Sequence, residues 1–216
     1  MIPINSEQEL KNLKKQHGNR LFTFKKESVE IIQSFNEEKC QKIGQLFQRL
    51  QFIFIVESSA TIKNPSDALM LDFFINMEIA KLLDKPPWIN KKGKIINNTV
   101  TLKEFKDIAE INEIIEKNDD KIDKIITFRN KSLAHSDFDR STIEVLPVMD
   151  YLDMLREFSD ILFKILYFIS ESKKDELKGH NILFEISKRI ASMKSFYSNE
   201  SNLNKQLIFQ EVTKET

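Results

Sequence analysis

The sequence predicts an all-α fold, an irregular bundle of five to seven helices. Apolar residues recur at the spacing of a helix face over most of the 216 residues. Glycine occurs only 4 times, far below the ~7% of an average protein. Most of the few glycines and prolines lie where a helical pattern stops, so they mark helix ends; Gly44, inside the first pattern, is the exception.

Two helices are expected in the first part of the chain, a long one from about Lys26 to Val56 and a second one after Asn64-Pro65. The apolar face of the first consists of Ile32, Phe35, Ile43, Phe47, Leu50 and Phe54. Asn64 is a typical N-cap residue, and Pro65 suits a first helical turn. The apolar positions of the second helix, which Lys85-Pro86-Pro87-Trp88 ends, are Leu69, Phe73, Met77, Ala80 and Leu83.

A third helix is expected to open at Thr101, after a loop in which residues 95–100 form a small hairpin. Thr101 and Glu104 have the spacing of a capping box. The inward positions of this helix are Leu102, Phe105, Ile108 and Ile115. A fourth helix starts at Asn118-Asp119 and carries Ile122, Ile125 or Ile126, Arg129 and Leu133.

The last third of the chain predicts two further helices. A polar stretch from His135 to Leu146 is expected to be irregular, and Pro147 then opens an apolar helix with Leu152, Leu155, Leu162, Leu166 and Ile169. Gly179 precedes a helix with Leu183, Ile186, Ile190 and Met193. From Ser198 onward the chain is rich in Asn, Ser and Gln around Leu207-Ile208-Phe209, which predicts a mobile tail able to dock on another surface.

The chain therefore divides into an N-terminal basic segment (1–25), a helical domain (26–197) and a polar C-terminal tail (198–216). The basic stretch at its start contains Lys11, Lys14, Lys15, Arg20, Lys25 and Lys26. An ordinary solvated face and an RNA contact are both open for it.

Composition excludes much catalytic chemistry. No segment has the glycine spacing of a phosphate-binding loop or of a G-x-S-x-G nucleophile elbow. The one cysteine, Cys40, excludes an internal disulfide and a multi-cysteine zinc site, and we interpret it as a buried, inert thiol. With 3 scattered histidines we expect no metal and no cofactor. The 33 basic and 33 acidic residues balance, so any attraction to nucleic acid must come from a local patch.

The sequence predicts a cytoplasmic protein with no membrane contact. The first twenty residues contain no apolar core of a signal peptide. The longest mainly apolar stretch, Ile161 to Ile169, is far shorter than the ~20 residues that cross a bilayer. A single cysteine also fits a reducing compartment.

The segment Phe128 to Asp137 carries the most informative group of residues, in which Arg129, Asn130 and His135 lie close together. Histidine exchanges protons near neutral pH, and arginine binds a phosphate through two parallel hydrogen bonds. On a straight helix, six residues correspond to ~9 Å of rise and place the two side chains ~120° apart. Either the helix breaks near Ser132, or a second copy completes the site across a two-fold axis.

The string RNKSLAHSD resembles the R-x(4–6)-H motif of the HEPN superfamily, and it is most similar to the AbiU-like branch linked to abortive infection. This resemblance implies a HEPN-like helical domain that forms a homodimer through the motif face and cleaves RNA without a metal. It implies that Arg129 stabilises the phosphate, His135 acts as acid or base, and Asn130 positions them. Tyrosine follows the histidine in relatives silenced by nucleotidylation, whereas this chain has Ser136, Asp137 and Phe138, which puts that regulation in doubt.

Other interpretations of these residues stay open. Arg129 can pair with Asp137 or with an acid on a neighbouring helix, and His135 can simply cap a helix end. Asp137 either orients the histidine or makes the turn. Lys131 and the loop residues Trp88, Lys91, Lys92 and Lys94 are candidate RNA contacts, because an aromatic ring among lysines suits unpaired bases and phosphates. Trp88 can equally anchor that loop to the core.

The leading functional hypothesis is a metal-independent endoribonuclease of a toxin–antitoxin or antiphage abortive-infection system. Its partners would be RNA, whether tRNA, mRNA or rRNA, and an antitoxin or defence protein. The alternative is a catalytically silent helical interaction module that works with a partner protein. A third hypothesis is a nucleotide-sensing module that uses Arg129 as its phosphate anchor.

Overall fold

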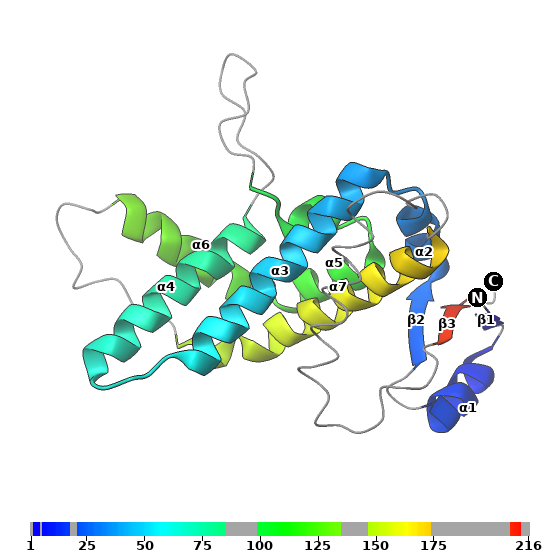
Figure 1. Cartoon of the computed structure of the whole chain (residues 1–216), viewed down its shortest axis with the longest axis horizontal. Helices are drawn as coiled ribbons and strands as arrows, with labels where there is room; N and C mark the ends of the chain where they lie inside the picture. The colour runs from blue at the N-terminus through cyan, green and yellow to red at the C-terminus, as the bar shows by residue number, and fades with distance from the viewer. Residues whose placement is uncertain are drawn as a thin grey trace, which may run out of the picture. The chain divides into compact units, whose positions relative to one another are not determined.

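The computed structural model describes residues 2–4, 6–17, 21–84, 99–134, 147–173 and 208–212 (Figure 1). These ranges form a helical bundle, so the predicted all-α class is confirmed. They contain α1 (Glu7–His17), α2 (Lys26–Gln33), α3 (Glu37–Ser59), α4 (Pro65–Leu83), α5 (Ala109–Lys117), α6 (Asp119–Ala134) and α7 (Leu152–Ser172). Two short 3-10 turns, η2 (Leu102–Phe105) and η4 (Val148–Asp150), precede α5 and α7.

The chain divides into two compact units. The described residues of the first come from Met1–Gly44, Asp107–Glu110 and Ile161–Thr216, and those of the second come from Gln45–Lys106 and Ile111–Asp160. The residues of the candidate site that the structure describes all belong to the second unit.

The first unit contains a small sheet that the sequence pattern did not predict. Its strands are β1 (Ile2–Ile4), β2 (Leu21–Lys25) and β3 (Ile208–Val212), in the order β1-β3-β2, and both pairings are parallel. Residues 208–212 belong to the tail that we expected to be mobile and able to dock, and they are docked between β1 and β2 as the central strand. Strands this short give little periodicity, and their pairing joins residues far apart in sequence, so a local pattern does not find them.

The long first helix is also not continuous, because α2 ends at Gln33 and α3 begins at Glu37. At the break, the side-chain oxygen of Asn36 accepts the Lys39 N–H at 2.9 Å and so caps α3. The ammonium group of Lys173 donates to the Phe35 carbonyl at 2.5 Å, and both residues are buried. Because Phe35 remains in the core across the break, the apolar spacing alone conceals it.

Helix α4 begins as predicted, with the Asn64 side chain accepting the Asp67 N–H at 3.0 Å and Pro65 in the first turn. Its apolar face is only partly buried. Ala80 and Leu83 lie in the core, whereas Leu69 is 55% and Phe73 is 40% exposed. The N-terminal half of this helix therefore presents apolar side chains to solvent.

The third predicted helix is split, since η2 ends at Phe105 and α5 starts at Ala109. The Glu104 carboxylate accepts the Thr101 N–H at 3.0 Å, as the capping-box spacing predicted. Leu102, Phe105 and Ile108 are buried, but Ile115 is only half-buried, because the break interrupts the helical spacing.

The later helices follow the predictions closely. Helix α6 starts after Asn118 and buries Ile122 and Ile125, whereas α7 starts at Leu152 after η4 rather than at Pro147. Cys40 is fully buried, as expected. The predicted helix after Gly179 and residues 95–98 of the predicted hairpin lie outside the described residues.

Candidate functional site

The last turns of α6 carry the three motif residues that the structure describes, Arg129, Asn130 and Lys131. The helix continues through Ala134, so the break that we considered near Ser132 does not occur. His135 and Asp137 lie outside the described residues. The described helix thus ends one residue before the histidine.

The Arg129 guanidinium is held on two sides. Its Nη1 donates to Oδ2 of Asp84, and the two side chains are 13% and 15% exposed. Its Nε and Nη2 both donate to Oδ1 of Asn130, at 3.2 and 2.8 Å. Two acceptors from different places in the sequence therefore fix the plane of the guanidinium group before any ligand arrives.

These contacts leave Arg129 with capacity for another acceptor. They use three of the five N–H groups of the side chain. One N–H on each terminal nitrogen has no partner among the residues that the structure describes. An arginine fixed in this way can still bind a phosphate oxygen, and its plane is already oriented.

Helices α4 and α6 pack against each other (Figure 1). This packing brings Asp84, directly after α4, next to Arg129 in α6. The rings of Phe73 and Phe128 meet edge to face, with centroids 5.5 Å apart and planes at 71°. Phe128 is 4% exposed, so the residue directly before Arg129 is fixed in the core of the second unit. Asp84 lies at the C-terminal end of α4, in extended backbone with φ −66° and ψ 169°.

Asp84 was missed as a member of the site by the sequence analysis. It is separated from Arg129 by 45 residues, and no local spacing connects them. A signal did exist in composition, because Asp84 is the one acid among six lysines between Lys81 and Lys103. The pairing of Arg129 with an acid on a neighbouring helix, one of the open interpretations, is thereby confirmed.

Arg49 provides a contrast within the same unit. Its Nη1 donates to the backbone carbonyl of Val100 at 3.1 Å. Burial lowers the pKa of Arg49, and the nearby Glu78 carboxylate acts in the opposite direction. This arginine fastens α3 to the chain before η2, which is a structural task.

The other predicted site residues are placed only in part. Asn130 and Lys131 are exposed, whereas Trp88, Lys91, Lys92 and Lys94 lie outside the described residues. Across the described ranges, no cluster of three His, Cys, Asp or Glu side chains could hold a metal ion. In the same part of the chain, no helix has the length and apolar character needed to span a membrane.

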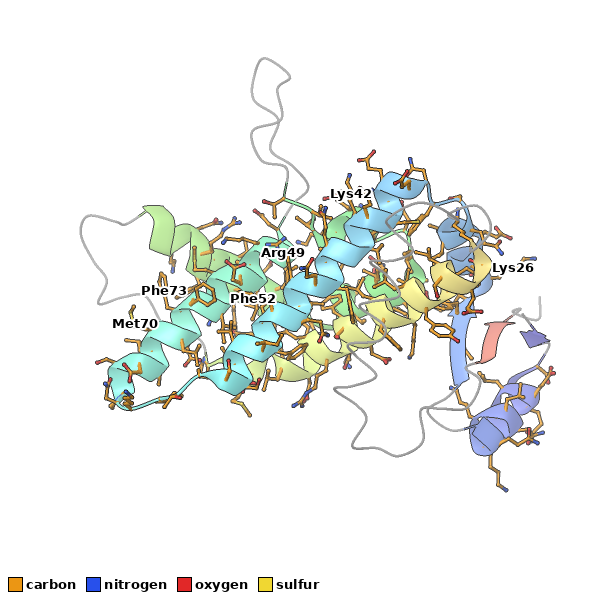
Figure 2. All side chains as sticks on the ribbon, viewed as in Figure 1. Lys26, Lys42, Arg49, Phe52, Met70 and Phe73 are labelled. Carbon is orange, nitrogen blue, oxygen red and sulfur yellow. The ribbon has the colours of Figure 1, made fainter. Side chains whose placement is uncertain are left out.

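Apolar side chains gather on α3 and α4 at the surface of the second unit. We call this set the α3/α4 apolar surface, and Figure 2 shows Phe52, Met70 and Phe73 of it. Met70 is 72% exposed, and the rings of Phe52 and Phe74 meet edge to face at 6.4 Å. The surface consists of Phe52, Ile55, Leu69, Met70, Phe73 and Phe74.

No protein-family model matches the chain, and neither a curated protein nor a solved structure is detectably similar to it.

Proposed function

We propose that this protein is a metal-independent endoribonuclease of a toxin–antitoxin or antiphage abortive-infection system. The observation that carries the proposal is the Arg129 guanidinium, which Asp84 and Asn130 orient and which keeps two N–H donors for a phosphate. The resemblance of the surrounding string to the HEPN motif gives this arginine its partner, His135.

In the proposed reaction, the ribose 2′-oxygen forms a bond to the adjacent phosphorus, and the bond from phosphorus to the 5′-oxygen breaks. The products are a 2′,3′-cyclic phosphate and a 5′-hydroxyl. His135 accepts the proton of the 2′-hydroxyl or supplies the proton to the leaving oxygen. Arg129 stabilises the negative charge that grows on the phosphate oxygens in the transition state. Asn130 positions the arginine, because its side-chain oxygen holds two nitrogens of the guanidinium group.

We propose further that the active form is a homodimer through the motif face. If the helix continued beyond Ala134, a residue six positions after Arg129 would lie ~120° away from it, so a second copy would complete each site. The α3/α4 apolar surface supports this arrangement, because Phe73 belongs to it and contacts Phe128, the neighbour of Arg129. Exposed apolar side chains that gather on one surface are typical of an interaction site.

The test is RNA cleavage by the purified full chain in the presence of EDTA. We expect cleavage to persist with the chelator, and His135→Ala and Arg129→Ala each to lower the rate by ~10²-fold or more. His17→Ala is the matched control, because this histidine lies outside the motif, and it should leave the rate unchanged. A wild-type rate in both motif variants would contradict the proposal.

A second candidate function has one observation in its favour. The ion pair of Arg129 with Asp84 gives the arginine a structural task, as expected for a catalytically silent interaction module. Such a module would be harmless when expressed in cells, and His135→Ala would change nothing. A nucleotide sensor would instead bind a mononucleotide tightly through Arg129 without cleaving RNA. Growth arrest by the wild-type chain, relieved in His135→Ala, would favour the ribonuclease over both.

A further inference from the structure

The sheet of the first unit has its last strand in the middle. β3 pairs with β1 along one edge, where Ile2 aligns with Gln210, and with β2 along the other, where Thr23 aligns with the same Gln210. β1 and β2 are not neighbours in the sheet. β1 and β2 therefore both have β3 as their hydrogen-bonding partner in the sheet. Without β3, a gap one strand wide would lie between β1 and β2, and each would present an unpaired edge to it.

The strand on one side of this gap, β2, has contacts in addition to its pairing with β3. Phe24 of β2 is 2% exposed, and its ring meets that of Phe168 in α7 edge to face at 5.9 Å. The Lys25 N–H donates to the Glu110 carboxylate at 2.7 Å. β1 is connected to β2 through α1, which contacts both strands. The gap thus lies between β1 and β2, and α1 contacts both of these strands.

β3 itself is attached in a different way. It follows α7 in the sequence after residues 173–207. Parallel pairing is slightly less stable per residue than antiparallel pairing, and β3 is only five residues long. Because β3 belongs to the same chain, it acts as an intramolecular ligand of β1 and β2.

We propose that the gap between β1 and β2 is a strand-acceptor site, which binds an extended peptide parallel to both strands. Residues 208–212 fill this site in cis as a tethered and replaceable ligand. Main-chain hydrogen bonds on two edges supply the affinity, as in other cases of recognition by strand addition. A peptide that replaces β3 is expected to resemble it, with β-branched and aromatic residues in an extended segment, as in Ile208-Phe209-Gln210-Glu211-Val212.

The first experiment empties the site in the full-length chain. Gln210→Pro removes a backbone N–H and fixes φ at a residue that is aligned with Ile2 on one side and Thr23 on the other, which disfavours a central position for this strand. A fluorescent peptide of residues 205–216 is then added, and binding is measured by anisotropy. We expect the variant to bind the peptide at least ~10-fold more tightly than the wild-type chain, whose own strand competes for the site.

The matched control is the same peptide with Gln210 replaced by proline, which should not bind either chain. Equal affinity of the variant and the wild-type chain for the unmodified peptide would overturn the proposal, as would the absence of binding to a folded variant. If the wild-type chain is a dimer that Gln210→Pro converts to monomers, the strand is exchanged between copies, and the cis assignment is wrong.

A second experiment does not require the variant to fold with an empty site. A protease recognition sequence replaces residues 199–205 of the full chain, and the chain is cut after folding. The fragment that contains β3 should stay bound at high concentration and leave when excess wild-type peptide is added, but not when the proline peptide is added. Loss of the fragment immediately after cleavage at every concentration would overturn the proposal.

Discussion

Asp84 and Glu110 each hold a polar cluster in a partly buried position, but their partners differ. Asp84, in the second unit, pairs with the Arg129 guanidinium. Glu110, in the first unit, accepts the Lys25 N–H at 2.7 Å and the Ser28 hydroxyl at 2.5 Å. The Ser28 oxygen in turn accepts the Ala109 N–H at 3.1 Å. We refer to these as the Asp84 cluster and the Glu110 cluster.

This difference in partners means that the Glu110 cluster stabilises the fold, whereas the Asp84 cluster orients a side chain that can bind a ligand. The donors of the Glu110 cluster are backbone groups at the starts of α2 and α5 and a hydroxyl that is fully buried, so the carboxylate ties two helix starts together. In the Asp84 cluster the donor is a side chain that keeps two N–H groups for another acceptor. The same type of acid thus completes a fold in one unit and orients a candidate catalytic group in the other.

The largest expected effect on stability is that of Glu110→Ala. The substitution leaves the Ser28 hydroxyl and the Lys25 N–H without their acceptor, and we expect the free energy of unfolding to fall by about 3 kcal/mol. Urea denaturation followed by circular dichroism measures it. The control is Asp123→Ala, which removes an exposed carboxylate from α6 and should change stability by less than about 0.5 kcal/mol.

Asp84→Ala should have a smaller effect on stability and a larger one on function. We expect a loss of about 2 kcal/mol, because the partly buried Arg129 loses its charged partner. A double-mutant cycle with Arg129→Met, measured by urea denaturation, should give a coupling energy of at least about 1 kcal/mol. RNA cleavage should fall ~10-fold or more in Asp84→Ala, since the guanidinium group loses its orientation. An unchanged rate of RNA cleavage in Asp84→Ala would mean that Asp84, like Glu110, has only a structural role.

Ser28→Ala removes the hydroxyl that donates to Glu110 and accepts the Ala109 N–H, and so it weakens the Glu110 cluster. The Ala109 N–H loses its acceptor, and Glu110 loses one of its donors, so we expect a cost of about 1 kcal/mol. Thermal unfolding should therefore show a modest decrease in Tm, and RNA cleavage should be unchanged. Ser58→Ala, which removes an exposed hydroxyl on α3, is the matched control. A change in cleavage rate with Ser28→Ala would remove the distinction between the two clusters.

Asn130→Ala should have the smallest effect on stability, less than about 0.5 kcal/mol, because the residue is exposed. Its effect on function should be several-fold, since the Arg129 plane loses two of its three hydrogen bonds. Asn130→Asp keeps the acceptor but adds a negative charge that competes with the phosphate, and we expect it to lower RNA affinity in a filter-binding assay. Equal RNA affinity for the wild-type chain and both variants would mean that Asn130 does not position the arginine.

Local signals in the sequence were sufficient for the helical class and for several helix starts. Asn64 before Pro65, Glu104 after Thr101, and Asn118 before α6 each act within four residues of themselves, so their hydrogen bonds are decided by neighbours in the chain. The same locality explains why the first helix was predicted as continuous. Ser34 and Asn36 interrupt this helix without interrupting the apolar spacing.

The sequence by itself determined that the chain is helical, that Cys40 is buried, and that Arg129 and Asn130 are neighbours on one helix. Only the tertiary structure decided that Asp84 holds the arginine and that residues 208–212 form the central strand of a sheet. The physical reason is the same in both cases. These contacts join residues 45 positions apart or at opposite ends of the chain, where packing and backbone pairing, rather than local spacing, select the partner.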